Sequence, residues 1–157
     1  MNAFLNYRLD ETMSRELENT IASSTIETFE QIFGYKLSFK PANDTIYSSD
    51  MIVANVEFWE NFETFNVCFI FEKELILSLV GKVYEQGMME LNAADELCKD
   101  AVCELANIIS NKIKLFINKQ GFNSVMEIPT AEIMNEINTA DMLHKIQINF
   151  CPLNSDV

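Results

Sequence analysis

The sequence predicts an α+β fold, in which one antiparallel β-sheet packs against helices. The order of the periodic segments and the need to bury their apolar sides predict it. The periodic segments follow one another as a helix, two strands, two helices and two extended segments, and one antiparallel sheet covered by helices buries the apolar sides of all of them. No low-complexity linker or internal repeat is apparent, and the length suffices for a sizeable core, so we expect a single domain over residues 1–157.

The first half of the chain predicts a helix, a connection and a hairpin. Residues 13–34 place Ile21, Ile26, Phe29, Ile32 and Phe33 on one broad helical face, and Gly34 is suited to end the helix. Residues 40–50 form a turn-rich connection. Residues 51–72 combine β-branched and aromatic residues around a polar break at Glu60–Asn61, which predicts two strands joined as a hairpin.

The second half predicts two helices and then extended chain. Helical periodicity returns over residues 72–86 and again over residues 93–119, the longest periodic run, with glycines after each. Residues 124–135 are expected to be extended around Pro129, because the residue before a proline disfavours α geometry. Residues 143–151 alternate apolar and polar side chains, as a half-buried strand does.

The charge and cysteine content exclude several classes of function. With 24 acidic and 11 basic side chains, the net charge is −13, which disfavours nucleic acids and anionic membranes as partners. No stretch approaches the roughly 18 apolar residues of a membrane span. The four cysteines (Cys68, Cys98, Cys103 and Cys151) form no CxxC pair, and His144 is the only histidine, so we expect no zinc site. We expect Cys98 and Cys103 to pack as small apolar residues, and the protein to be cytoplasmic, with reduced thiols.

A polar ridge runs along the helix predicted over residues 93–119. At about 100° per residue, Asp100, Glu104, Asn107 and Asn111 fall within a wedge roughly 60° wide. The opposite half is expected to hold the apolar residues Ala101, Val102, Leu105, Ile108, Ile109, Ile113, Leu115 and Phe116. Lys112 lies nearer this apolar half, where its stem could extend along the surface. The ridge fits an ordinary solvated helix face, although two asparagines in a helix interior are unfavourable enough to suggest a role.

These residues resemble a known signature. The pattern Asp100-x3-Glu104-x2-Asn107, followed by Pro129 after twenty-one intervening residues, resembles that of the CheC/CheX/FliY family, phosphatases that act on the phosphorylated chemotaxis response regulator CheY. The surrounding DELCKDAVCELANIISNKIKLFI is also similar to the family's active helix. With one copy of the motif, the chain is more similar to CheX than to the two-motif CheC proteins. The resemblance is specific over about residues 93–130.

The resemblance implies a CheX-like fold and hydrolysis of the aspartyl phosphate of a CheY-type receiver. Asn107 would orient the attacking water, since a carboxamide both accepts and donates hydrogen bonds. Glu104 would pair with the receiver's active-site lysine, and Asp100 and Asn111 would extend this contact or lie at its rim. The protein would need no cofactor of its own, because Mg²⁺ belongs to the receiver's active site.

Two further expectations concern partners and activity. CheX-like proteins are homodimers built through their sheets, and the apolar strand FNVCFIF is a candidate pairing edge. The sequence departs from the family where Ser110 and Asn111 occupy a region that usually contains glycine, and where residues 51–65 lack the glycines common in the hairpin. The alternatives are a non-catalytic module of the same fold, which binds receivers or serves in motor-switch assembly, and an unrelated α+β domain.

Overall fold

The structure is a computed structural model that describes residues 11–41, 46–47, 49–60, 63–83, 91–138 and 148–152. A helix, a run of strands, two helices and a second run of strands follow one another, in the α+β order that the sequence predicts. The elements are α1 (Glu11–Phe33), β1 (Leu37–Pro41), β2 (Ile46–Tyr47), β3 (Met51–Glu60), β4 (Glu63–Glu72), α2 (Lys73–Val83), α3 (Leu91–Lys119), β5 (Val125–Met126), β6 (Thr130–Met134), β7 (Ile137–Asn138) and β8 (Ile148–Pro152).

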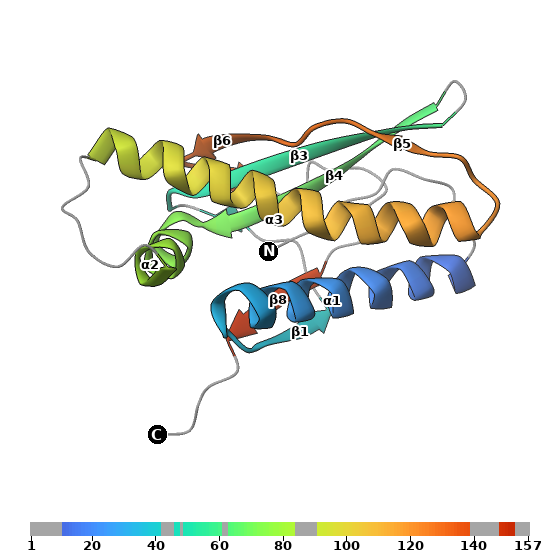
Figure 1. Cartoon of the computed structure of the whole chain (residues 1–157), viewed down its shortest axis with the longest axis horizontal. Helices are drawn as coiled ribbons and strands as arrows, with labels where there is room; N and C mark the ends of the chain where they lie inside the picture. Colours follow the sequence, from blue (N-terminus) through green and yellow to red (C-terminus); the bar gives the residue numbers. More distant parts are fainter. Residues whose placement is uncertain are drawn as a thin grey trace.

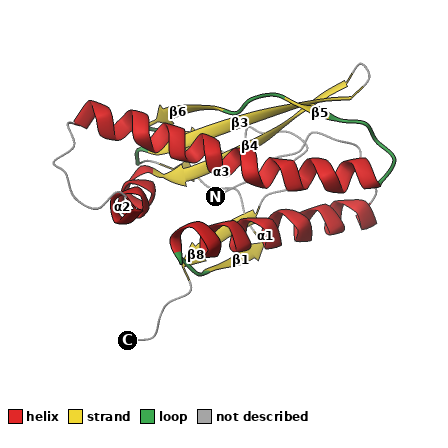
Figure 2. Cartoon of the chain, in the orientation of Figure 1, coloured by secondary structure: helices red, strands yellow, loops and turns green. Residues whose placement is uncertain are grey.

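Strand β3 is the centre of the main sheet. It pairs along its whole length with β4, in an antiparallel register that places Met51 opposite Glu72 and Glu60 opposite Glu63. On its other side β3 pairs with β5 and then with β6, both antiparallel. The predicted hairpin over residues 51–72 is therefore confirmed, and β4 forms one edge of this sheet within the described residues (Figure 2).

The helices cover one face of this sheet. Figure 1 shows α3 lying across β3 and β4, with α1 alongside α3 and running in the opposite direction. The strands turn alternate residues toward the helices, as strand geometry requires. On β3 and β4 these are the facing pairs Ile52–Phe71, Ala54–Phe69, Val56–Val67 and Phe58–Phe65. The helices complete this core with apolar residues from α1, α2 and α3, which include Leu17, Ile21, Ile76, Leu105 and Ile109.

The opposite face of the sheet is covered only in part. Near the start of β3, Met51 and Val53 pack with Cys68, Ile70 and Ile137 in a second buried cluster. Toward the end of the hairpin the same face opens to solvent, where the Trp59 side chain is exposed. At its start, where both of its faces are covered, β3 therefore has apolar side chains on both faces. Toward its end, where only the helix-facing side is covered, apolar side chains alternate with exposed or polar ones.

The periodic segments are confirmed as elements, while two short sheets were not predicted. Strand β1 pairs with β8 at the far end of the chain, and β2 pairs with β7. The strand predicted over residues 143–151 is confirmed as β8 where the structure describes it, from Ile148 on. Residues 143–147 and Gly87 lie outside the described residues. Gly34 ends α1 at a positive φ of 63° and donates its N–H to the Glu30 carbonyl at 2.9 Å, which confirms it as the C-terminal stop.

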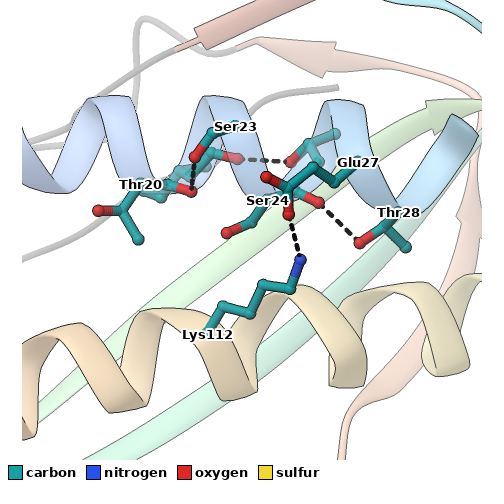
Figure 3. A network of polar contacts seen from close by, with 8 residues as sticks. Thr20, Ser23, Ser24, Glu27, Thr28 and Lys112 are labelled. Carbon is teal, nitrogen blue, oxygen red and sulfur yellow. Dashed lines mark hydrogen bonds and ion pairs between the residues drawn. The ribbon is translucent and has the colours of Figure 1, made fainter. Parts of the chain in front are cut away.

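Ion pairs hold α3 to its neighbours. The Lys112 Nζ lies 2.9 Å from Glu27 Oε2 of α1, as Figure 3 shows, which explains a lysine near the apolar half of α3. At the other end of α3, Lys73 Nζ lies 2.7 Å from Asp95 Oδ1 and 3.9 Å from Asp50 Oδ2. The hydrogen bond to Asp95 is the main reason that the pKa of Lys73 is raised. Together with the core, these contacts fix the position of α3 on the sheet.

Candidate functional site

The polar ridge of α3 faces outward. Asp100, Glu104 and Asn111 are exposed and Asn107 is half-buried, while Leu105 and Ile109 of the opposite side are buried in the core. The helix is therefore amphipathic as predicted. Leu115 is an exception, because its side chain is 62% exposed. At about 100° per residue it follows Asn111 on the ridge side of the helix, so its assignment to the apolar half was wrong.

The ridge forms one wall of an open cavity of about 440 Å³. The other wall is the segment that joins β5 to β6, which runs beside α3. All four ridge residues line this cavity, together with Cys103, Lys114, Met126, Glu127, Ile128 and Pro129. The structure thus brings Pro129, which lies far from the ridge in sequence, into the same site as Glu104 and Asn107. The physical reason is the pairing of β5 and β6 with β3, which lies beneath α3.

The two asparagines of the ridge are joined by hydrogen bonds. The Asn111 Nδ2 donates to the backbone carbonyl of Asn107 at 2.9 Å and to its side-chain Oδ1 at 3.3 Å. The Asn107 oxygen retains a second lone pair, because a carboxamide oxygen can accept two hydrogen bonds. This contact orients the Asn107 carboxamide and leaves its oxygen able to accept a hydrogen bond from the cavity.

The β5–β6 segment presents an apolar side chain beside the ridge. The Glu127 N–H donates to the Glu57 carbonyl of β3 at 2.8 Å, and Pro129 is buried. Between these two anchored residues, Ile128 is 87% exposed. Sequence patterns did not identify Ile128 as a site residue. The sequence offered one indication of its role, since Ile128 directly precedes Pro129 in a segment that was expected to be extended.

A second, more apolar cavity of about 300 Å³ adjoins the first. It lies between α1, α2 and α3, and its apolar lining includes Ile32, Val80 and Leu97. Asp100 and Glu104 line both cavities. The exposed carboxylates of the ridge therefore lie between a polar hollow and an apolar one.

The cysteines near the ridge differ in their surroundings. Cys98 is buried as predicted, but Cys103 is only partly buried and lines the larger cavity. Partial burial, and then the carboxylate of Asp100, raise the pKa of the Cys103 thiol, which disfavours the thiolate. Among the described residues, no group of three His, Cys, Asp or Glu side chains could hold a metal ion. The site offers hydrogen-bonding and charged groups suited to contact a partner.

Comparison with known proteins identifies the family. The family model described as "Chemotaxis phosphatase CheX" matches residues 52–151, which include the hairpin, α3 and the β5–β6 segment. The chain belongs to the CheX family. None of the curated proteins searched matches it. Within the described part of this CheX-family chain, no helix is long and apolar enough to cross a membrane.

Solved structures show the same fold. The chemotaxis protein CheX from Desulfovibrio desulfuricans is 14% identical, with a TM-score of 0.59 over 87% of this chain and 99% of that one. A CheC-like superfamily protein from Shewanella sp. PV-4 is 18% identical, with a TM-score of 0.63 over 87% and 97%. CheX from Borrelia burgdorferi, solved in a complex with CheY, BeF3 and Mg²⁺, is 14% identical, with a TM-score of 0.58 over 92% and 99%.

Proposed function

We propose that this CheX-family protein hydrolyses the aspartyl phosphate of a phosphorylated CheY-type receiver. The observation that carries the proposal is the shared cavity of Glu104, Asn107 and Pro129, which places the exposed ridge of α3 where a partner protein can reach it. The family description as a chemotaxis phosphatase supports the reaction. The Borrelia CheX–CheY complex supports a receiver as the partner.

Asn107 orients the water that attacks phosphorus. The water oxygen forms a bond to phosphorus while the bond from phosphorus to the aspartate oxygen breaks, and the products are a free aspartate carboxylate, inorganic phosphate and a proton. An acyl phosphate is labile, and the receiver supplies Mg²⁺ to its phosphoryl group, so an aligned water is the main requirement. The Asn107 oxygen accepts a hydrogen bond from this water, and its amide can donate to the phosphoryl oxygens.

Glu104 fixes the docking register. It is exposed one turn before Asn107 on the same face of α3, so a receiver lysine that pairs with it brings the phosphorylated aspartate toward Asn107. Asp100 and Asn111 extend the contact surface along the ridge. The sheet, α1 and the Lys73 ion pairs hold α3 in place, so the helix is a rigid support for Asn107. Rigidity matters because a small misplacement of the attacking water lowers the reaction rate strongly.

A purified CheY-type receiver is phosphorylated with acetyl phosphate in the presence of Mg²⁺. The experiment then measures its rate of dephosphorylation with and without the CheX-family protein. We expect acceleration, a lower rate with Asn107→Ala, and a raised KM with Glu104→Lys. An unchanged rate with Asn107→Ala would remove its assigned role. A receiver that binds but is not dephosphorylated faster would instead favour the non-catalytic module of the same fold.

We also propose that the protein is cytoplasmic and forms a homodimer through the β4 edge. Strand β4 is ten residues long, and within the described residues only β3 pairs with it. Such an edge presents backbone groups that a second copy can pair with. Light scattering should give twice the mass of one chain, and a monomer mass at all concentrations would contradict the dimer.

A further inference from the structure

The cavity beside α3 contains a basic residue that the proposed reaction leaves unused. Lys114 lines this cavity together with Glu104 and Asn107. Among the described residues of the cavity wall, Lys114 is the only basic one, while Asp100, Glu104 and Glu127 are acidic. In a chain with 24 acidic and 11 basic side chains, a lysine at this place marks a point where a negative group can be bound.

Lys114 lies on the same face of α3 as the asparagine that orients the water. It follows Asn107 by seven residues and Asn111 by three, and at about 100° per residue the three lie within roughly 60° of one another. Two helical turns, about 10 Å along the axis, separate Lys114 from Asn107. Side chains on a helix tilt toward its N-terminus, so the flexible stem of Lys114 can carry its ammonium group back toward Asn107.

The ammonium group of Lys114 is not used within the described part of the protein. No described carboxylate lies within ion-pairing distance of it, not even that of Glu127 on the other wall of the cavity. Other lysines on α3 and beside it form ion pairs, namely Lys73 with Asp95, Lys99 with Glu96 and Lys112 with Glu27. Lys114 is half-buried, as a lysine is when its stem packs on the protein and its charged head stays in solvent.

We infer that Lys114 binds the phosphoryl group of the docked receiver and makes the site selective for the phosphorylated form. This inference rests on the proposed function of Glu104 and Asn107. A phosphoryl group adds negative charge and strong acceptor oxygens to the receiver's aspartate. Lysine binds phosphoryl oxygens as a compact point charge, so Lys114 attracts the phosphorylated receiver more strongly than the unmodified one.

The charges along α3 then match the groups that the receiver presents. Glu104 pairs with the receiver's lysine, Asn107 holds the water one turn later, and Lys114 reaches the phosphoryl oxygens from the C-terminal side. Without Lys114, the carboxylates of the cavity and the net charge of −13 would only repel a phosphoryl group. The reaction is the hydrolysis described above, in which Lys114 keeps its proton and forms no covalent bond.

The test measures binding and turnover separately. Titration gives the Kd of a purified CheY-type receiver with Mg²⁺, either unmodified or loaded with beryllium fluoride, a stable analogue of the phosphoryl group. The dephosphorylation assay gives KM and kcat for the phosphorylated receiver. Lys114→Gln removes the charge and Lys114→Arg keeps it. Lys119→Gln is the matched control, because Lys119 is an exposed lysine of the same helix that does not line the cavity.

We expect Lys114→Gln to raise the Kd of the loaded receiver and the KM of the phosphorylated one about fivefold. The Kd of the unmodified receiver should change by less than about twofold, because the phosphoryl group is absent. Lys114→Arg should retain most of the preference for the loaded form, and Lys119→Gln should match the wild type. Circular dichroism melts check that all variants fold.

The outcomes separate this inference from the proposed function. If the wild type hydrolyses no receiver but this binding pattern holds, the proposed function fails and the role of Lys114 in recognition is supported. If the wild type is active and Lys114→Gln weakens binding of both receiver forms equally, the proposed function stands and the inference is overturned. Unchanged affinities in Lys114→Gln overturn it as well. If the wild type binds neither receiver form, both proposals fail.

Discussion

Asn111 donates its side-chain amide to the Asn107 carboxamide oxygen at 3.3 Å and to the Asn107 backbone carbonyl at 2.9 Å. One ridge residue therefore sets the orientation of the next. A carboxamide held in this way keeps a second lone pair on its oxygen and both N–H groups for other partners. This makes Asn111 a positioning residue for the proposed reaction, a more specific role than the contact expected from sequence.

Replacing the donor by an acceptor should disturb the orientation of Asn107. In Asn111→Asp, the carboxylate attracts the Asn107 NH₂ and turns the carboxamide around, so we expect kcat for receiver dephosphorylation to fall about tenfold with KM changed little. Asn111→Gln keeps an amide donor and should restore part of kcat. A fall in kcat/KM that comes entirely from KM would show that Asn111 only contacts the receiver.

The exposed Ile128 should contribute to partner binding. An aliphatic side chain that is 87% exposed beside the ridge can be buried by a docked receiver, which favours binding. We expect Ile128→Asp to raise KM about five- to tenfold with little change in kcat or in the melting temperature. Val125→Asp is the matched control, since Val125 is also exposed, at 59%, but does not line the cavity. Equal effects of both variants would contradict a specific role for Ile128.

Two buried serines should respond to substitution in opposite directions. Ser110 is 0% exposed, and its Oγ has no hydrogen-bond partner in the described part of the structure. Ser124 is 2% exposed and donates its hydroxyl to Asn118 Oδ1 at 2.8 Å. We expect Ser110→Ala to raise the free energy of unfolding by about 1 kcal/mol and Ser124→Ala to lower it by a similar amount. Urea unfolding monitored by circular dichroism measures both, and a destabilised Ser110→Ala would contradict the unpaired hydroxyl.

The buried thiol of Cys68 should make stability fall in alkali. Burial, and then the carboxylate of Glu132, raise the pKa of Cys68 from 9.0 to about 12. Below pH 9 the thiol is protonated in both states and has no effect. Above pH 9 the unfolded state loses the proton while the folded state keeps it, so unfolding becomes easier, by roughly 1–2 kcal/mol near pH 10.5.

The measurement for Cys68 is the free energy of unfolding at pH 8 and pH 10.5. Other groups titrate in this range, so Cys68→Ala serves as the reference. We expect the decrease between the two pH values to be smaller in Cys68→Ala than in the wild type. An identical decrease in both proteins would show that Cys68 ionises equally easily in the folded and unfolded states.

The long elements could be predicted from the sequence because their periodicity is local. Helix α3 was predicted over residues 93–119 and spans Leu91–Lys119, and the β3–β4 hairpin was predicted within its observed range. Strand β1 was not predicted, because it forms by pairing with β8, whose residues lie more than a hundred positions later in the chain. Local patterns carry no information on such a partner.

The site was predicted in part for the same reason. Its ridge residues share one helix, so rotation about the helix axis identified their common face. Ile128 joined the site only through the position of the β5–β6 segment beside α3. The role of Asn111 depended on the direction of one side chain, which spacing does not determine.

Strand β3 determines the shape of the cavity although it contributes no residue to it. It pairs with β5 and β6 on one side, and α3 lies across it, so β3 holds both walls of the cavity. A substitution that shifts the register of β3 would therefore move the β5–β6 segment relative to the ridge and change the site without touching any of its side chains.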